Sequence, residues 1–148
     1  MIIKYSRIED SVNLPLRANP SDAGLDVFYI GEHCSIEPGG NQVLSTGLKF
    51  EIPHGYMLQV CNRGSMGAKH SLIAGAHIID SGYDGEVFID LHNIGKETKY
   101  IKTGQKIAQL VMIPVIPFRL LQVDEDELYR ENVTISDRGA GALGSTGN

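Results

Sequence analysis

Residues 74–89, AGAHIIDSGYDGEVFI, carry the clearest local signal in this chain of 148 residues. The apolar run 77–79 leads to Asp80, and glycines on both sides of Tyr83 mark a tight turn. Residues 86–89, EVFI, then have the pattern of a strand. The pattern predicts a β-hairpin whose tip presents a carboxylate and an aromatic ring. An ordinary hairpin with polar turn residues has the same pattern, so any chemistry must be argued from the rest of the chain.

Length and composition indicate a globular protein of one domain. The chain has 42% hydrophobic residues, 21% charged residues and 17 glycines, a glycine share well above the usual value of about 7%. Its formal net charge of -5 argues against binding to nucleic acid or to an anionic membrane. A phosphate ligand would therefore need local cations or a metal ion.

The two cysteines, Cys34 and Cys61, are isolated, and the five histidines follow no zinc-ligand spacing. The first ten residues do not resemble a signal peptide, and no apolar run approaches the length of a membrane span. We therefore expect a cytoplasmic protein with reduced thiols.

Short apolar or alternating runs between glycine and proline turns predict an all-β fold, either a sandwich, a jelly roll or a barrel. The predicted strands are residues 2–5, 25–30, 42–52 with a break at Gly47, 56–61 and 106–115. Residues 62–70 predict one helical turn, and the acidic residues 124–128 predict the start of another short helix.

The C-terminal residues 136–148 are rich in glycine and include the pattern GxGxxG at 139–144. A dinucleotide-binding unit is excluded, because no strand-turn-helix can follow so close to the end of the chain. A P-loop is excluded because no lysine follows Gly144. Backbone N–H groups, hydroxyls and Arg138 suit a phosphate, whereas a disordered tail would have the same composition.

Four further positions complete a candidate site. Arg63, in the segment RGSMGAK, offers a cation next to a hydroxyl and a predicted helix start. Asp26 and Asp80 are carboxylates at the ends of separate predicted strands. Gln109 is a polar residue within an apolar run, so it is either a structural bridge or a ligand contact.

Five segments of this chain resemble the motifs of the homotrimeric dUTP pyrophosphatases (dUTPases). They are DAGLDV, NRGSMGAK, GAHIIDSGYDGEV, TGQKIAQL and RGAGALGSTG, and they span residues 22–147 in the order and spacing of that family. A phage or viral source would suit the divergence, and the protein would then act in the host cytoplasm.

The resemblance implies a distorted jelly roll, or β-clip barrel, with one short helix and a mobile glycine-rich C-terminal arm. Residues 1–126 would form the barrel domain, and residues 127–148 would be an arm that closes over a neighbouring subunit's site. The protein would be a homotrimer with shared active sites. It would convert dUTP and water to dUMP and pyrophosphate, limiting uracil in DNA and supplying dUMP for dTMP synthesis.

The resemblance also implies the roles of individual residues. Asp80 would be the general base, and Asp26 would support the metal's water shell or neighbouring polar groups. Mg²⁺ would be held by phosphates and waters, with no direct protein ligand. Tyr83 would pack on the deoxyribose and exclude a 2′-hydroxyl. The residues implied in substrate binding are Arg63, Gly64, Ser65, Lys69, Ala76, Ile79, Tyr83, Gln109, Arg138, Leu143, Gly144, Ser145 and Thr146.

Several positions depart from the family pattern. Leu25 replaces an aromatic residue, and Asn62 and Gly64 stand where Pro and Ser are usual. The hydroxyl contact of that serine to a bridging phosphate oxygen is therefore missing at Gly64. Ala74 stands where some relatives have an asparagine for the base, and Leu143 stands where a phenylalanine would stack over uracil.

Three other classes of protein remain as alternatives. A dCTP deaminase-like enzyme shares the implied fold and would release ammonia from dCTP. A binding or regulatory protein on this fold would bind dUTP without hydrolysing it, and the intact Asp80 argues against that. A structural jelly roll does not explain why Arg63, Asp80, Tyr83, Gln109 and Arg138 occur together.

Overall fold

The computed structural model describes residues 1–128 and residue 130. By its internal contacts the chain divides into two units, residues 1–117 and residues 118–148. The first unit ends earlier than the barrel domain predicted for residues 1–126. The arm predicted for residues 127–148 lies almost entirely outside the described residues, so its role stays a prediction.

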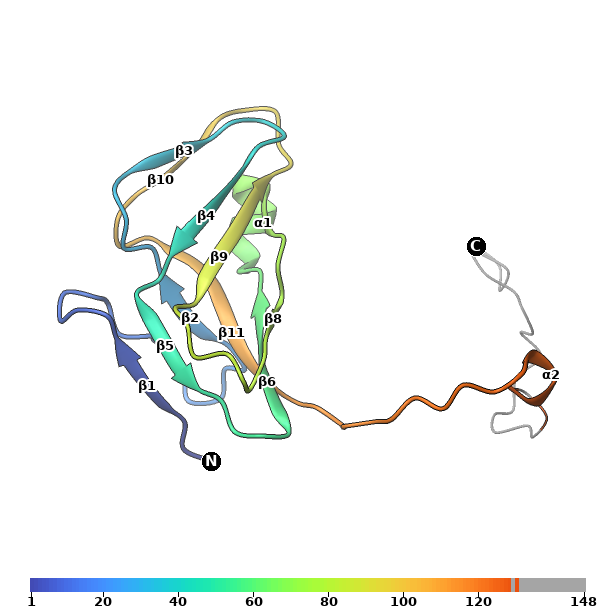
Figure 1. Cartoon of the computed structure of the whole chain (residues 1–148). Helices are drawn as coiled ribbons and strands as arrows, with labels where there is room; N and C mark the ends of the chain where they lie inside the picture. The colour runs from blue at the N-terminus through green and yellow to red at the C-terminus, as the bar shows by residue number, and fades with distance from the viewer. Residues whose placement is uncertain (129, 131–148) are drawn as a thin grey trace. The chain divides into compact units, whose positions relative to one another are not determined.

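Strands dominate the first unit, as the all-β prediction required (Figure 1). They are β1 (Lys4–Arg7), β2 (Leu25–Phe28), β3 (Cys34–Ile36), β4 (Asn41–Ser45), β5 (Leu48–Glu51), β6 (Tyr56–Cys61), β7 (Leu72–Ala74), β8 (Ile78–Ile79), β9 (Phe88–Asn93), β10 (Lys99–Ile101) and β11 (Lys106–Pro114). Helix α1 (Gly64–His70) lies in the predicted helical turn, and α2 (Glu125–Leu128) lies in the acidic stretch of the second unit. No helix among the described residues is long and apolar enough to cross a membrane.

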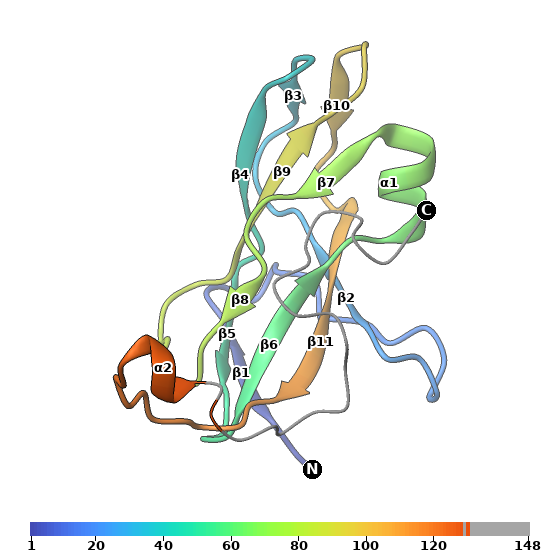
Figure 2. The ribbon, with the colours of Figure 1, turned by 90° about the vertical axis from the view of Figure 1, so that its right-hand side faces the viewer.

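The strands pair into small sheets. One has the order β2-β11-β6-β8, a second has the order β4-β9-β7, and β1-β5 and β10-β3 form two-stranded pairs. All of these pairings are antiparallel. Figure 2 shows β9 between β4 and β7, and β11 between β2 and β6. The arrangement confirms the predicted jelly-roll-like architecture.

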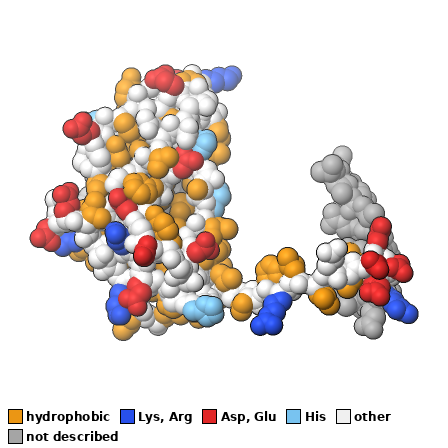
Figure 3. All heavy atoms as spheres, viewed as in Figure 1, with side chains coloured by type: hydrophobic (Ala, Val, Ile, Leu, Met, Phe, Trp, Pro, Cys, Tyr) orange, Lys and Arg blue, Asp and Glu red, His pale blue; other side chains and the backbone are white. Residues whose placement is uncertain are grey.

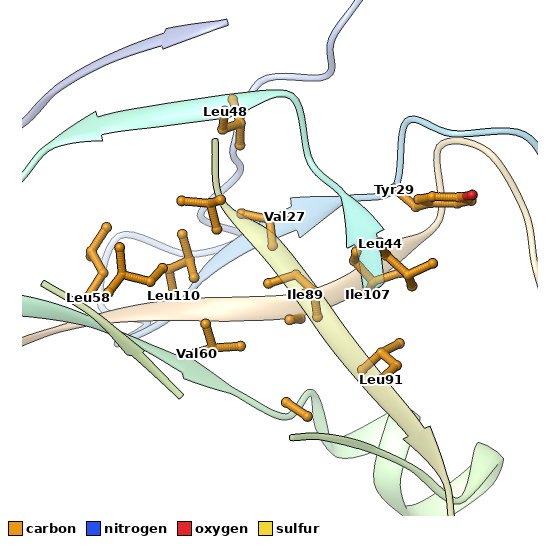
Figure 4. Packing of buried hydrophobic residues seen from close by; sticks show 14 of the residues in the cluster. Val27, Tyr29, Leu44, Leu48, Leu58, Val60, Ile89, Leu91, Ile107 and Leu110 are labelled. Atoms are coloured by element: carbon orange, nitrogen blue, oxygen red, sulfur yellow. The ribbon is translucent and has the colours of Figure 1, made fainter. Parts of the chain in front are cut away.

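Apolar side chains that alternate along the strands meet between the two larger sheets. Ile89 and Leu91 of β9 face Ile107 and Leu110 of β11, and all four are at most 1% exposed (Figure 4). Val60 of β6 joins the same cluster. Burial of such side chains stabilises a fold by about 1.5–3 kcal/mol each, so this contact fixes β11 and β6, the strands on which several site residues depend.

The break predicted at Gly47 is present and has a backbone cause. Gly47 has φ +67, a left-handed conformation that glycine adopts without steric cost. A side chain there would also collide with Val12, because a Cβ atom would lie 2.6 Å from its Cγ2. The predicted strand 42–52 therefore divides into β4, which pairs with β9, and β5, which pairs with β1.

The hairpin predicted for residues 74–89 is wrong. β8 pairs with β6, with Leu58 opposite Ile79, whereas β9 pairs with β4 and β7. Residues 80–87 are therefore a loop that joins two different sheets. The alternation of residues 86–89 is real, since Val87 and Ile89 are buried while Phe88 is exposed, but the partner strands come from elsewhere in the chain.

In the second unit, the described residues expose apolar side chains. Phe118, Leu120 and Leu121 are each more than 80% exposed. Acidic side chains gather on α2 (Figure 3), whose first turn contains Glu125, Asp126 and Glu127. Acidic residues at a helix start interact favourably with the helix dipole.

Candidate functional site

Asp26, Arg63 and Gln109 come together at the end of β6. Gln109 of β11 lies opposite Asp26 of β2 on one side and opposite Cys61 of β6 on the other. Arg63 follows β6, and its Nε donates a 2.9 Å hydrogen bond to Oδ1 of Asp26. Three predicted site residues, far apart in sequence, thus form one cluster.

A second cation completes this cluster, and the sequence did not single it out. Nζ of Lys106 lies 2.8 Å from Oδ2 of Asp26. A register shift between Lys106 and Ala108 in the β11–β2 ladder accompanies this contact. Both oxygens of Asp26 are thus engaged by cations. The three charges leave one net positive charge, on side chains about 30% exposed for Arg63 and Lys106, which favours an anionic ligand.

Gln109 forms the structural bridge that was one of its two predicted roles. Its Nε2 donates a 2.9 Å hydrogen bond to the carbonyl oxygen of Asn62, and Oδ1 of Asn62 accepts one of 2.7 Å from the N–H of Ala74. Gly24 lies against the amide, because a Cβ atom at residue 24 would lie 2.0 Å from Oε1 of Gln109. Asn62 and Gly24 are therefore supporting residues that the sequence reasoning missed.

Helix α1 begins directly after Arg63, which has an extended backbone with φ -79 and ψ 139. Gly64 is exposed, and a Cβ atom there would meet nothing within 4 Å. Ser65 is half-buried, and Lys69 is exposed in the last turn. Gly64, Ser65 and Lys69 therefore follow Arg63 on α1, and a side chain at residue 64 would have open space.

Asp80 and Tyr83 lie on the loop 80–87. The N–H of Tyr83 donates a 3.1 Å hydrogen bond to the carbonyl oxygen of Asp80, and the Tyr83 hydroxyl donates one of 2.7 Å to the carbonyl oxygen of Glu86. The phenol lies against Gly85, where a Cβ atom would be 2.5 Å from the hydroxyl oxygen. Asp80 is exposed, and among the described residues its carboxylate has no hydrogen-bond or ion-pair partner, so it can meet a ligand.

A cavity of about 210 Å³ opens beside this loop. It is bounded by β8, by Asp80 and Tyr83, and by the first residue of β9, Phe88. Ile79 lines it, whereas Ala76 is exposed on the segment before β8. A larger cavity of about 450 Å³ between β3 and β10 contains none of the predicted site residues.

Within one chain, Asp80 and Arg63 lie at opposite ends of β6. The β6–β8 register, with Leu58 opposite Ile79, places Asp80 at the level of Met57. Arg63 is six residues further along an extended backbone, which at about 3.3 Å per residue corresponds to roughly 20 Å. A single chain therefore presents two half-sites, one with the cations and one with the exposed carboxylate and tyrosine.

No group of three or more His, Cys, Asp or Glu residues that could hold a metal ion occurs in the described part of the chain. Asp26 was predicted to support a metal's water shell or neighbouring polar groups, and in the structure it is paired with Arg63 and Lys106. Arg138, Leu143, Gly144, Ser145 and Thr146 lie outside the described residues.

Comparisons with known proteins agree with these features. Residues 10–147 match the model of the family described as dUTPase. The chain is 38% identical over 147 residues to the deoxyuridine 5'-triphosphate nucleotidohydrolase of Clostridium acetobutylicum and 37% identical over 147 residues to that of Alkaliphilus metalliredigens. Each alignment covers 98% of this chain and 96% of the relative.

Solved structures of phage proteins are similar over most or nearly all of the chain. The structure of a variant dUTPase of Staphylococcus bacteriophage 80alpha with dUpNHpp has a TM-score of 0.86, 25% identity, and coverage of 99% of both chains. A variant dUTPase from phage phi11 of S. aureus has a TM-score of 0.77 and 26% identity, with 84% of this chain and 98% of that chain covered. That structure is described as revealing the coordination of a structural Mg(II) ion.

Proposed function

Because this chain belongs to the dUTPase family, we propose that it hydrolyses dUTP to dUMP and pyrophosphate, with water attacking the α-phosphorus. The reaction would limit uracil in DNA and supply dUMP for dTMP synthesis. The observation that carries the proposal is the cluster of Asp26, Arg63, Lys106 and Gln109, in which the carboxylate of Asp26 orients two cations, Arg63 and Lys106. Such a cluster suits a polyphosphate in a protein whose net charge is negative.

Arg63 and Gln109 would hold the α- and β-phosphates, with Ser65 and Lys69 nearby on α1. Asp26 acts through Arg63 and Lys106, because both of its oxygens are used to hold them. Phosphoryl transfer depends mainly on positioning and on neutralising charge, and a guanidinium fixed by a carboxylate loses little conformational freedom when it binds. This accounts for a carboxylate inside a phosphate site.

Asp80 would be the general base. Its carboxylate is exposed at the end of β8, beside the 210 Å³ cavity, and it can accept a proton from a water molecule that attacks phosphorus. Uracil would enter that cavity and bind main-chain groups near Ala76 and Ile79. Cytosine would reverse a donor and an acceptor there and leave buried groups unpaired.

Tyr83 would select the sugar. Its hydroxyl is held by the carbonyl oxygen of Glu86, so the ring has a fixed position at the edge of the cavity. Packing of this ring on the deoxyribose would leave no space for a 2′-hydroxyl.

The separation of Asp80 from Arg63 supports a site shared between subunits of a homotrimer. A distance of roughly 20 Å is too long for one dUTP to bring the phosphates to Arg63 and the reacting water to Asp80 of the same chain. A second copy would supply the 80–87 loop. Residues 127–148 of a further copy would close over the ligand, with Arg138, Ser145 and Thr146 at the γ-phosphate and Leu143 and Gly144 over the base.

Mg²⁺ would reach this site on the triphosphate. The described residues offer no carboxylate cage, and magnesium is commonly held by phosphate oxygens and waters in nucleotide sites. Its chemistry would be to neutralise phosphate charge. The residues of this chain would bind and orient the phosphates around it.

The test is pyrophosphate release from dUTP, dCTP, dTTP and UTP in the presence of Mg²⁺, for the natural chain and for Asp80→Asn. We expect turnover of dUTP alone and its loss in Asp80→Asn. Ammonia release from dCTP would instead indicate a deaminase. Binding of dUTP without turnover would indicate a binding protein, and activity that survives in Asp80→Asn would assign the base elsewhere.

A further inference from the structure

Glu86 connects the loop 80–87 to the turn between β4 and β5. Its Oε1 accepts a 2.7 Å hydrogen bond from the N–H of Gly47 and a second hydrogen bond from the hydroxyl of Ser45. The next residue, Val87, donates from its N–H to the carbonyl oxygen of Leu48 over 2.8 Å and accepts from the Thr46 hydroxyl over 2.6 Å. The end of the loop is thus attached to residues 45–48 by its side chain and by its backbone.

The β4–β5 turn, which binds the carboxylate of Glu86, has a fixed conformation. Gly47 is buried and has φ +67, and any side chain there would meet Val12. Thr46 is 1% exposed. The N–H group that faces Glu86 therefore has one well-defined position, set by packing on the core.

The position of the Tyr83 ring depends more on this attachment than on packing against the core. Its side chain is 44% exposed, so the core does not hold the ring. Its hydroxyl donates to the backbone carbonyl of Glu86, the residue whose side chain is bound to Ser45 and Gly47. A chain of hydrogen bonds therefore runs from the β4–β5 turn through Glu86 to the phenol.

We propose that Glu86 is a positioning residue that sets sugar selectivity: its carboxylate holds the 80–87 loop on the β4–β5 turn, and thereby holds Tyr83 where it excludes a 2′-hydroxyl. The inference rests on the proposed function, in which Tyr83 packs on the deoxyribose. Without the carboxylate, the loop retains the two hydrogen bonds made by the backbone N–H and carbonyl of Val87. The residue whose carbonyl orients Tyr83, however, is no longer bound to Ser45 and Gly47 through its side chain. The ring then moves, and a ribose fits.

The experiment compares kcat/KM for dUTP and for UTP in Glu86→Ala, Glu86→Gln and Tyr83→Ala. Glu86→Ala loses two hydrogen bonds to a charged group. We expect its dUTP/UTP ratio to fall about tenfold or more, since the loss of one such bond is already of that order. Glu86→Gln keeps the shape and an acceptor oxygen, so its ratio should lie between those of Glu86→Ala and the natural chain. Tyr83→Ala should have the lowest ratio.

The matched control is Glu37→Gln. Oε2 of Glu37 accepts a 2.6 Å hydrogen bond from the hydroxyl of Thr98, so this variant weakens a similar contact in a different part of the fold. Its selectivity should equal that of the natural chain. Melting temperatures of all variants separate a loss of stability from a change in selectivity, and Ser45→Ala serves if Glu86→Ala does not fold.

A folded Glu86→Ala protein with the natural dUTP/UTP ratio would overturn the inference and leave the proposed function intact. If the natural chain fails to hydrolyse dUTP, the proposed function fails, and amide hydrogen exchange of residues 80–87 decides the positioning role. Faster exchange in Glu86→Ala than in Glu37→Gln would support that role, and equal exchange would exclude it.

Discussion

Arg63 donates from Nε to Oδ1 of Asp26 over 2.9 Å, and this contact joins the end of β6 to β2. The carboxylate is the more buried partner, since its side chain is 14% exposed against 27% for Arg63. Asp26 also binds Lys106 through its other oxygen. One carboxylate therefore sets the position of two cations that we assign to phosphate binding.

Asp26→Asn should reduce both stability and activity, because it leaves two neighbouring cations with no opposite charge. We expect the free energy of unfolding to fall by about 1–2 kcal/mol, since the three side chains are only partly exposed. We expect kcat/KM for dUTP to fall about tenfold or more as Arg63 loses its fixed orientation. Urea unfolding and steady-state kinetics measure the two effects.

The control for this variant is Glu51→Gln, which removes the exposed pair between Lys4 and Glu51. Exposed pairs contribute about 0–1 kcal/mol, so both quantities should stay near those of the natural chain. Equal effects of the two substitutions would contradict the role given to Asp26.

Gly64→Ser should increase activity. A Cβ atom at residue 64 meets nothing within 4 Å, so the serine fits, and its hydroxyl lies next to Arg63 at the start of α1. A new hydrogen bond to a phosphate oxygen should raise kcat/KM for dUTP by about tenfold. Gly67→Ser is the matched control, because a Cβ atom at residue 67 of the same helix also meets nothing within 4 Å. A similar gain in both variants would mean that helix propensity is the cause.

Gly24→Ala should displace Gln109. The added Cβ atom would lie 2.0 Å from Oε1 and 2.7 Å from Cδ of that side chain, so the amide must leave its position on Asn62. Overpacking of this kind costs about 1–3 kcal/mol, and kcat/KM should fall as well. In the double variant Gly24→Ala/Gln109→Ala the collision with the amide is absent, and only a tight contact of 3.1 Å with the Cβ atom of residue 109 remains. Its loss of stability should therefore be smaller than the sum of the single losses. Additive losses of stability would contradict the contact between residue 24 and Gln109.

These contacts mark the limit of what the sequence could predict. Alternation and glycine turns were enough to find β6, the break at Gly47 and the helix after Arg63, because those features depend on neighbouring residues. The partner of Ile79 is Leu58, 21 positions earlier in the chain, so the local pattern of residues 74–89 could not reveal that β8 pairs with β6 rather than β9. Local periodicity carries no information on strand pairing over that distance.

The candidate site shows the same limit. The motif resemblance singled out Asp26, Arg63 and Gln109, and the structure places them together. Lys106 was missed because its contact with Asp26 depends on a register shift in β11. Glu86 was missed because its partners, Ser45 and Gly47, meet it only through tertiary folding.

Asn41→Ala should lower the free energy of unfolding at neutral pH and reduce the further decrease of that free energy as the pH falls. The pKa of Asp90 is lowered, chiefly by the 2.8 Å hydrogen bond from Nδ2 of Asn41, with burial opposing and with His92 adding to the effect. A lowered pKa in the folded state contributes stability that is present above the unfolded value of about 3.9 and is lost as the pH falls through the folded value. Without Asn41 this contribution shrinks, so the natural chain and the variant should converge in strong acid.

Urea unfolding between about pH 2 and pH 6 measures this difference. Asp90→Asn supplies the reference, because it has no carboxylic acid at that position. Adding Asn41→Ala to Asp90→Asn should change stability by the same amount at every pH. A pH-dependent effect in that background would assign the acid response to another group.

Mixing two inactive variants should restore activity if each site uses Arg63 from one chain and Asp80 from another. Arg63→Ala and Asp80→Asn should each be inactive alone, and random assembly of equal amounts into trimers should leave about a quarter of the sites with both intact residues. Coexpression followed by measurement of pyrophosphate release from dUTP tests this. A chain with both substitutions, coexpressed with Asp80→Asn, is the control, because no subunit then supplies Asp80. Mixed trimers of Arg63→Ala and Asp80→Asn that remain as inactive as this control would show that both residues must come from one chain, contrary to the roughly 20 Å that the β6–β8 register puts between them.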